Sequence, residues 1–147
     1  MTEALNPELV MQLEVASAQL VAQDIRQIEL VDPEGNELPA FTPGAHLLIQ
    51  APNGATRRYS ITNPPSERQH YVIAVKREAG GRGGSISVVD GIATGQLVHV
   101  SLPRNEFELT DKAPAYLFIA GGIGITPIRS MIVTFAMPPP SHIVCKP

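Results

Sequence analysis

The segment Arg57–Asn63 ("RRYSITN") places two cations, an aromatic ring and two hydroxyl groups within seven residues. In a β-strand, the period of two puts the side chains of Arg57 and Tyr59 on one face, so a positive charge lies beside a flat ring. That pair suits a planar heterocycle that carries a phosphate. Ser60 points away in an ideal strand, unless the strand twists or ends there. Taken alone, a tyrosine on an alternating strand is more often a core residue.

The segment 80–85 ("GGRGGS") contains four glycines around Arg82. Glycine permits positive φ, so consecutive backbone N–H groups can converge on an anion. A short helix opening at Ser85 would add its N-terminal amides, and Arg82 would add a charge-assisted hydrogen bond to a phosphate. The same residues also fit a flexible hairpin loop. One RGG sequence in an acidic chain is a weaker case for an RNA contact.

The segment 121–127 ("GGIGITP") stands between a predicted strand and a predicted helix. Thr126 fits a helix N-cap and Pro127 fits the first helical position. Gly122 and Gly124 would let a ligand or another backbone approach closely. No Lys-Ser/Thr follows, which excludes a Walker A loop, and no acid stands about 20 residues further on, so a dinucleotide fingerprint is incomplete. A tight strand–helix turn explains the segment equally well.

Short alternating or apolar segments must position these motifs, and turn formers such as Asn53–Gly54 separate them. Six short strands with turns between them predict a mainly β fold, a closed six-stranded antiparallel barrel. The expected strands are 10–20, 24–31, 45–52, 57–63, 70–77 and 96–103.

The composition changes after Asp111, because residues 112–147 contain no acidic residue. The apolar run 115–120 ("AYLFIA") has the length and character of a buried parallel strand. A glycine turn and a short helix at 128–136 follow it. This order predicts the first strand–turn–helix of an incomplete α/β nucleotide-binding domain.

Composition and charge exclude several classes of protein. The 147 residues are 44% hydrophobic with a net charge of −3, which argues against disorder and against a nucleic-acid or membrane-surface binder. The single cysteine, Cys145, excludes an internal disulfide and a four-cysteine iron–sulfur or zinc site within this chain. No metal is assigned to the scattered His46, His70, His99 and His142. No apolar run of membrane-spanning length and no signal pattern occurs, so a cytoplasmic location is expected.

The motifs "RRYS", "YVIAVKREAGGRGGS", "VSLPRNEFEL" and "LFIAGGIGITP" follow one another in an order and spacing that resemble the ferredoxin–NADP reductase superfamily. Within it the chain is most similar to the phthalate dioxygenase reductase family, the reductase components of Rieske oxygenases. The resemblance covers about residues 10–132. It implies a six-stranded Greek-key barrel that binds FMN, an α/β domain that binds NADH, and a plant-type 2Fe–2S domain.

The resemblance also implies roles for individual residues. Arg57 matches the arginine at the flavin phosphate, Tyr59 would lie against the isoalloxazine ring, and Ser60 would lie near its N5 atom. Tyr59 and Ser60 are therefore the implied catalytic residues. The other implied cofactor-binding residues are Arg58, then Ala74, Val75 and Lys76 on the strand bordering the flavin, Arg82, Gly83, Gly84 and Ser85 in the phosphate loop, and Gly122, Gly124 and Thr126 in the turn facing the flavin.

These expectations divide the chain into an N-terminal extension (1–8), a flavin-binding barrel (9–111), the start of an NAD(P)-binding domain (112–132) and an irregular tail that departs from the family (133–147). FMN is expected rather than FAD, because no additional aromatic residue suits an adenine. NADH would be the electron donor and an oxygenase component the partner. The chain resembles a truncated or frameshifted reductase. Three classes stay open: an enzyme, an FMN-binding module without turnover, and a non-functional remnant.

Overall fold

The computed structural model describes residues 6–110 and 112–135. All six predicted strands are present, the chain after Gly83 takes the helix that was one of its expected conformations, and the helix expected near the "GGIGITP" segment is formed. The elements in chain order are β1 (Met11–Ala22), β2 (Ile25–Val31), β3 (His46–Gln50), β4 (Thr56–Ser60), β5 (Tyr71–Lys76), α1 (Gly84–Gly91), β6 (Leu97–Val100), the 3₁₀ helix η1 (Gly122–Gly124) and α2 (Ile125–Phe135).

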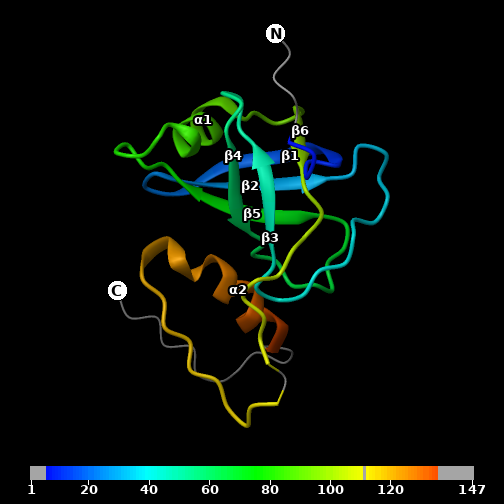
Figure 1. The fold of residues 1–147 in the computed structure, drawn as a ribbon, viewed down its shortest axis with the longest axis vertical. Coiled ribbons are helices and arrows are strands. Elements are labelled where there is room, and N and C mark those ends of the chain that lie inside the picture. Colours follow the sequence, from blue (N-terminus) through cyan, green and yellow to red (C-terminus); the bar gives the residue numbers. More distant parts are fainter. Residues whose placement is uncertain (1–5, 111, 136–147) are drawn as a thin grey trace.

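The strands form one antiparallel six-stranded sheet in the order β4-β3-β6-β1-β2-β5. The two outer strands, β4 and β5, approach each other, so the sheet curls into the predicted barrel. Figure 1 shows β3 and β4 crossing the β1, β2 and β5 layer, with α1 at one end of β4 and α2 beneath the barrel. Both β4 and β5 contact α1, and β5 also contacts the 3₁₀ helix η1 that leads into α2.

The barrel interior is filled from five of its strands. Val15, Ile28, Leu47, Ile73 and Val100, one from each of β1, β2, β3, β5 and β6, are fully buried. This pattern follows from the period of two, which turns alternate residues of each strand toward the core. β4 differs, since none of its five residues is fully buried. Its side chains are thus available to a surface site.

The predicted strand at 115–120 is wrong. No strand is formed there, and Leu117 and Ile119 are 85% and 82% exposed. A parallel strand depends on hydrogen bonds to neighbours on its flanks, and no strand within the described residues pairs with this segment. Instead Tyr116 stacks on Phe118 and on Phe135 of α2, with ring centroids 6.1 and 5.0 Å apart.

The predicted N-cap at Thr126 is also wrong. η1 runs directly into α2, which begins at Ile125, so Thr126 lies inside the helix and Pro127 occupies its third position. Proline is tolerated there because first-turn N–H groups have no partner within the helix. The helix continues to Phe135, so residues 133–135 are helical rather than part of the irregular tail expected from 133. Residues 136–147 lie outside the described residues.

Candidate functional site

A cleft of about 590 Å³ gathers most of the predicted site residues in one place. Its walls come from β4, β5, the loop before α1 with the first turn of that helix, and the η1–α2 segment. The residues that line it are Arg57, Arg58, Tyr59, Ser60, Ala74, Lys76, Glu78, Gly81, Arg82, Gly84, Ser85, Ile123, Gly124, Thr126 and Pro127. Segments far apart in sequence thus converge on one cavity.

Three predicted residues do not line the cleft. Val75 is fully buried, so its side chain belongs to the core and only its backbone can face a ligand. Gly83 caps α1 in the left-handed region, with φ 87°. Gly122 lies in η1 with φ 56°, a conformation that favours glycine. Gly83 and Gly122 thus shape the backbone beside the cleft, whereas the side chain of Val75 packs in the core.

Four lining residues were not predicted to belong to the site: Glu78, Gly81, Ile123 and Pro127. Each lies within the "EAGGRGGS" or "GGIGITP" segment. The predicted motifs therefore included all four residues. The sequence did not indicate which residues of these segments face the cleft, because irregular backbone has no fixed side-chain period.

Arg57 occupies the seam between β4 and α1. Its guanidinium donates to the carbonyl of Thr56 at 2.9 Å, and its side chain covers Gly84 so closely that a Cβ on that glycine would lie 2.5 Å from Nε. Arg58 points differently, because residues alternate along a strand, and it forms an exposed ion pair with Glu106. Of the two arginines of β4, Arg57 is therefore the one whose side chain lies against the N-terminus of α1.

Tyr59 carries an unusual hydroxyl group. The oxygen is buried, yet it has no hydrogen-bond partner among the described residues. Burial raises the pKa of Tyr59, and the positive charge of Arg57 opposes that rise. Burying a hydroxyl without a partner is unfavourable, so this group is suited to a ligand that brings its own polar atom. Ser60 is the last residue of β4, so the strand ends where its side chain meets the cleft.

The N-terminus of α1 opens onto the same cleft. Gly83 is its N-cap and makes no side-chain capping bond, and the first helical bond runs from the Ser87 N–H to the Gly83 carbonyl at 2.9 Å. The preceding N–H groups of the first turn are therefore not used by the helix. The Ser85 hydroxyl accepts the N–H of Glu78 at 3.0 Å, which leaves its proton to donate. Such an end attracts anions.

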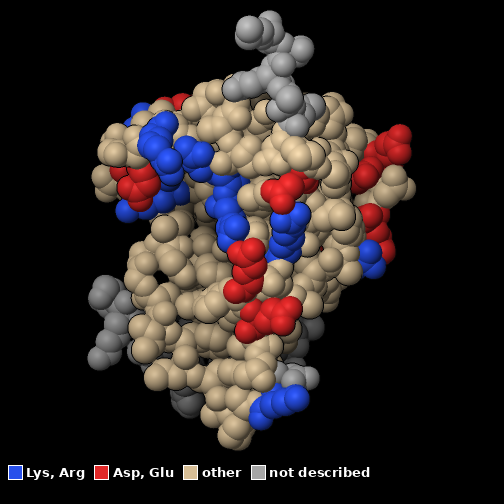
Figure 2. Space-filling model, in the orientation of Figure 1, with Lys and Arg blue, Asp and Glu red and all other residues tan. Residues whose placement is uncertain are grey.

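Positive charge dominates this part of the surface. Figure 2 shows Lys and Arg side chains running as a band from the α1 end of the molecule toward its centre. Within the cleft, Lys76 is paired with Glu78 at 3.4 Å, while Arg57 and Arg82 make no ion pair among the described residues. Two unpaired guanidinium groups at a helix N-terminus fit a phosphate better than a neutral ligand.

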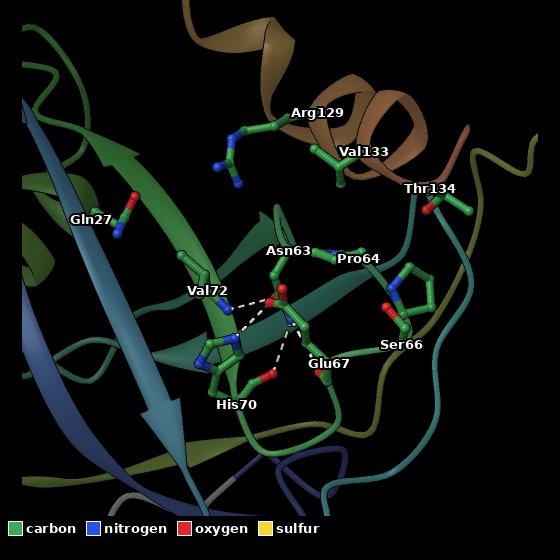
Figure 3. Close-up of a pocket in the computed structure, with 11 residues that line it drawn as sticks. Gln27, Asn63, Pro64, Ser66, Glu67, His70, Val72, Arg129, Val133 and Thr134 are labelled. Carbon is green, nitrogen blue, oxygen red and sulfur yellow. Dashed lines mark hydrogen bonds and ion pairs between the residues drawn. The ribbon is translucent and has the colours of Figure 1, made fainter. Parts of the chain in front are cut away.

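A second cavity, of about 630 Å³, lies between the 63–72 segment and α2 (Figure 3). Its polar centre is His70, whose two ring nitrogens contact Glu29 at 2.6 Å and Glu67 at 2.9 Å. Burial lowers the pKa of His70, but the hydrogen bonds to Glu67 and Glu29 outweigh it, so the pKa lies above its ordinary value. No residue predicted for the site lines this cavity.

Within residues 6–110 and 112–135, no group of three His, Cys, Asp and Glu side chains could hold a metal ion. No helix in that part of the chain has the length and hydropathy needed to cross a membrane.

The cleft fits a phosphate-bearing flavin by three independent features. The orphaned hydroxyl of Tyr59 offers a polar contact beside an aromatic ring. The α1 N-terminus and Arg57 offer an anion site, and Gly84 leaves the room that the Arg57 side chain occupies beside that N-terminus. Gly124 and the adjoining turn form a wall with room for a close approach.

Comparison with known proteins agrees with this geometry. Residues 12–109 match the family of oxidoreductase FAD-binding domains. This chain belongs to that family, a class of flavin-binding domains of oxidoreductases.

The particular resemblance to phthalate dioxygenase reductases is confirmed. The phthalate 4,5-dioxygenase oxygenase reductase subunit of Pseudomonas putida is 55% identical over 120 residues, which are 82% of this chain and 37% of that protein. Phthalate dioxygenase reductase of Burkholderia cepacia is 52% identical over 121 residues, again 82% of this chain and 38% of the relative.

A solved phthalate dioxygenase reductase, described as a modular structure for electron transfer from pyridine nucleotides to 2Fe–2S, superposes with a TM-score of 0.81 at 52% identity. The match covers 82% of this chain and 38% of that structure. The chain therefore spans little more than a third of the length of the relatives it matches.

Proposed function

We propose that this chain is the flavin-binding part of a reductase that passes electrons from NADH, through FMN, to the iron–sulfur centre of an oxygenase system. The observation that carries the proposal is the cleft in which Arg57, Tyr59 and the N-terminus of α1 face one another. The phthalate dioxygenase reductases named above support the electron-transfer role.

Each wall has its own task in this proposal. Arg57, Arg82 and the first-turn amides of α1 bind the flavin phosphate through charge-assisted hydrogen bonds. A close ion pair in a partly exposed site is worth about 1–4 kcal/mol, and each backbone N–H donor adds about 1 kcal/mol. Tyr59 packs against the ring, and Ser60 donates or accepts a hydrogen bond near N5.

The remaining predicted residues complete the pocket. Backbone of Ala74 and Val75 and the side chain of Lys76 border the ring, while Gly124 and Thr126 form the face where a nicotinamide would arrive. A bound flavin supplies the redox chemistry itself, taking up a hydride equivalent and releasing single electrons. The protein holds the ring, excludes water from one face and sets the polarity beside N5.

FMN rather than FAD is the proposed flavin. FAD carries an adenine and FMN does not, and the sequence offers no additional aromatic residue suited to stack on an adenine.

We further propose that residues 9–111 are the flavin barrel and that residues 112–132 begin an NAD(P)-binding domain. Of such a domain, the described residues supply the turn and one helix, η1 and α2. An FMN-binding module without turnover is the second candidate function, because the described residues form the flavin cleft but pair no strand with the 115–120 segment of the nucleotide-binding unit. NADH-dependent reduction of ferricyanide by the FMN-loaded chain separates the two candidates: turnover supports the enzyme, and saturable FMN binding without turnover supports the module.

The direct test of the flavin is a titration of the purified 147-residue chain with FMN, FAD and riboflavin, followed by flavin fluorescence. The proposal expects saturable binding of FMN and at least a tenfold weaker binding of riboflavin, which lacks the phosphate. FAD binding as tightly as FMN would contradict the choice of FMN. Equal affinity for riboflavin would contradict the phosphate site.

A further inference from the structure

The chain after β4 forms a rigid junction with β5. Thr62 and Asn63 are both 3% exposed. The Thr62 N–H donates to the Val72 carbonyl at 2.8 Å, and the Asn63 side-chain oxygen accepts the Val72 N–H at 2.9 Å. The Asn63 amide nitrogen also donates to the carbonyl of His70 at 3.1 Å, so little freedom is left at this point (Figure 3).

Two side chains of α2 donate to this junction. The Ser130 hydroxyl donates to the carbonyl of Asn63 at 2.8 Å, and the Arg129 guanidinium donates to the carbonyl of Thr62 at 3.0 Å. Figure 3 shows Arg129 reaching from α2 toward the barrel on the side of Asn63. We call these four residues the clasp. Ser130 is fully buried, so its bond is shielded from competing water.

The clasp is close in sequence to both walls of the flavin cleft. Thr62 follows Ser60 by two residues, and Arg129 follows Pro127 by two residues. Ser130 lies about one helical turn after Thr126. The chain is stiff over such short stretches of a helix and of hydrogen-bonded backbone. The hydrogen bonds from Arg129 and Ser130 to the Thr62 and Asn63 carbonyls therefore fix the distance between the α2 wall and the β4 wall of the cleft.

We propose that Ser130 and Arg129 are positioning residues that hold the Gly124–Pro127 wall at the correct distance from Tyr59 and Ser60. This inference rests on the proposed function, since it assumes that a flavin occupies the space between the walls. Neither residue touches the flavin. Their hydrogen bonds hold α2 against the barrel, so that the Gly124–Pro127 wall covers one face of the flavin ring.

The first test uses the flavin-free protein. Ser130→Ala and Arg129→Met, which keeps the aliphatic stem but removes the donor, are compared with Val133→Ala on the same helix. Amide hydrogen exchange of residues 125–131 should become at least tenfold faster in the two clasp variants and change less in the control. Exchange in β1 and β2 should stay the same. Unchanged exchange in residues 125–131 of both clasp variants would overturn the inference.

The second test measures the cleft itself with FMN bound. Both clasp variants should bind FMN at least tenfold more weakly, and iodide should quench the fluorescence of the bound flavin more strongly, because the wall no longer covers it. Arg129→Lys, which keeps a charged donor, should restore part of the protection from iodide. A merely structural role would lower stability without changing iodide access.

The outcomes separate the two proposals. If wild-type protein binds no flavin, the proposed function fails and the positioning role fails with it. If wild-type protein binds FMN but the clasp variants match it in affinity and iodide access, the positioning role alone is overturned. Arg129 is exposed, so Arg129→Met gives an answer even if Ser130→Ala does not fold.

Discussion

Arg57 of β4 lies directly over Gly84, the first residue of α1, and a Cβ at position 84 would meet the arginine Nε, Cζ and Cγ at 2.5, 2.9 and 3.0 Å. Two motifs that are separate in the sequence are therefore parts of one anion site. Helix stability does not explain the glycine at position 84, because glycine is a poor helix former. It makes room for the guanidinium beside the helix N-terminus.

This relationship predicts that Gly84→Ala separates stability from binding. Alanine favours the helix by up to about 1 kcal/mol, and the Arg57 side chain can swing away, so the free energy of unfolding should stay constant or rise. FMN affinity should fall about tenfold or more, because the displaced guanidinium no longer faces the phosphate. Denaturant unfolding and a flavin titration measure the two quantities.

Gly80→Ala is the matched control for Gly84→Ala, because nothing lies within 4 Å of a Cβ at position 80 in the same loop region. It should leave FMN affinity close to the wild-type value. Wild-type affinity in Gly84→Ala, with a stable protein, would show that Arg57 is not held by this contact.

The buried Tyr59 hydroxyl predicts opposite effects in the free and the flavin-bound protein. Tyr59→Phe removes a polar group that has no partner among the described residues, so the flavin-free protein should gain about 1 kcal/mol of stability. FMN affinity should fall, because the flavin loses a polar contact. Tyr71→Phe is the contrast, since the Tyr71 hydroxyl donates to the carbonyl of Pro39 and its loss should cost about 1–3 kcal/mol. A lower free energy of unfolding for Tyr59→Phe than for the wild type, both measured without flavin, would contradict this account.

Gly44 predicts where substitution damages the packing of α2 on the barrel. Its φ is +96°, and a Cβ would collide with the carbonyl of Phe107 and lie 2.7 Å from the terminal methyl of the buried Met131. Gly44→Ala should therefore lower the free energy of unfolding by about 2–4 kcal/mol. Gly35→Ala, at φ +79° with nothing within 4 Å, carries only the backbone strain and should cost about 1–2 kcal/mol. Equal losses in urea denaturation would refute the packing argument.

His70 predicts a pH-dependent part of the stability. Its pKa is raised above the ordinary value because hydrogen bonds to Glu67 and Glu29 outweigh burial, so the folded state binds the proton more tightly than the unfolded state. The stabilisation is complete below the unfolded pKa of about 6.5 and is lost as pH rises through the raised value. His70→Gln should therefore lose a few tenths to about 1 kcal/mol more at pH 6 than at pH 9. His99→Gln, which touches Gln12 rather than an acid, is the control.

The barrel could be predicted from the sequence because its causes are local. Alternation and turn pairs such as Asn53–Gly54 mark each strand, and strand ends differ from expectation by a few residues. The 115–120 segment shows the limit of this reasoning. Its apolar composition suits a buried strand, but a strand forms only with partners, and the described residues provide none.

The cleft could be predicted as a set of motifs but not as a geometry. Arg57 and Gly84 were both identified, yet their contact depends on how β4 and α1 approach each other. The clasp was not predicted at all, because Ser130 and Arg129 look like ordinary helix residues and their partners are backbone carbonyls. Hydrogen bonds to backbone leave no pairing pattern in a sequence.

The most direct measurement is an FMN titration of wild-type protein beside Arg57→Ala, with Arg104→Ala as the control. Arg104 carries the same charge but is paired with Glu8 at 2.6 Å and is not among the residues that line the cleft. The account predicts saturable binding in the wild type and the control, and a loss of about tenfold or more in Arg57→Ala. Equal affinity in all three proteins, or no binding by folded wild-type chain, would contradict the assignment of this cleft to a flavin phosphate.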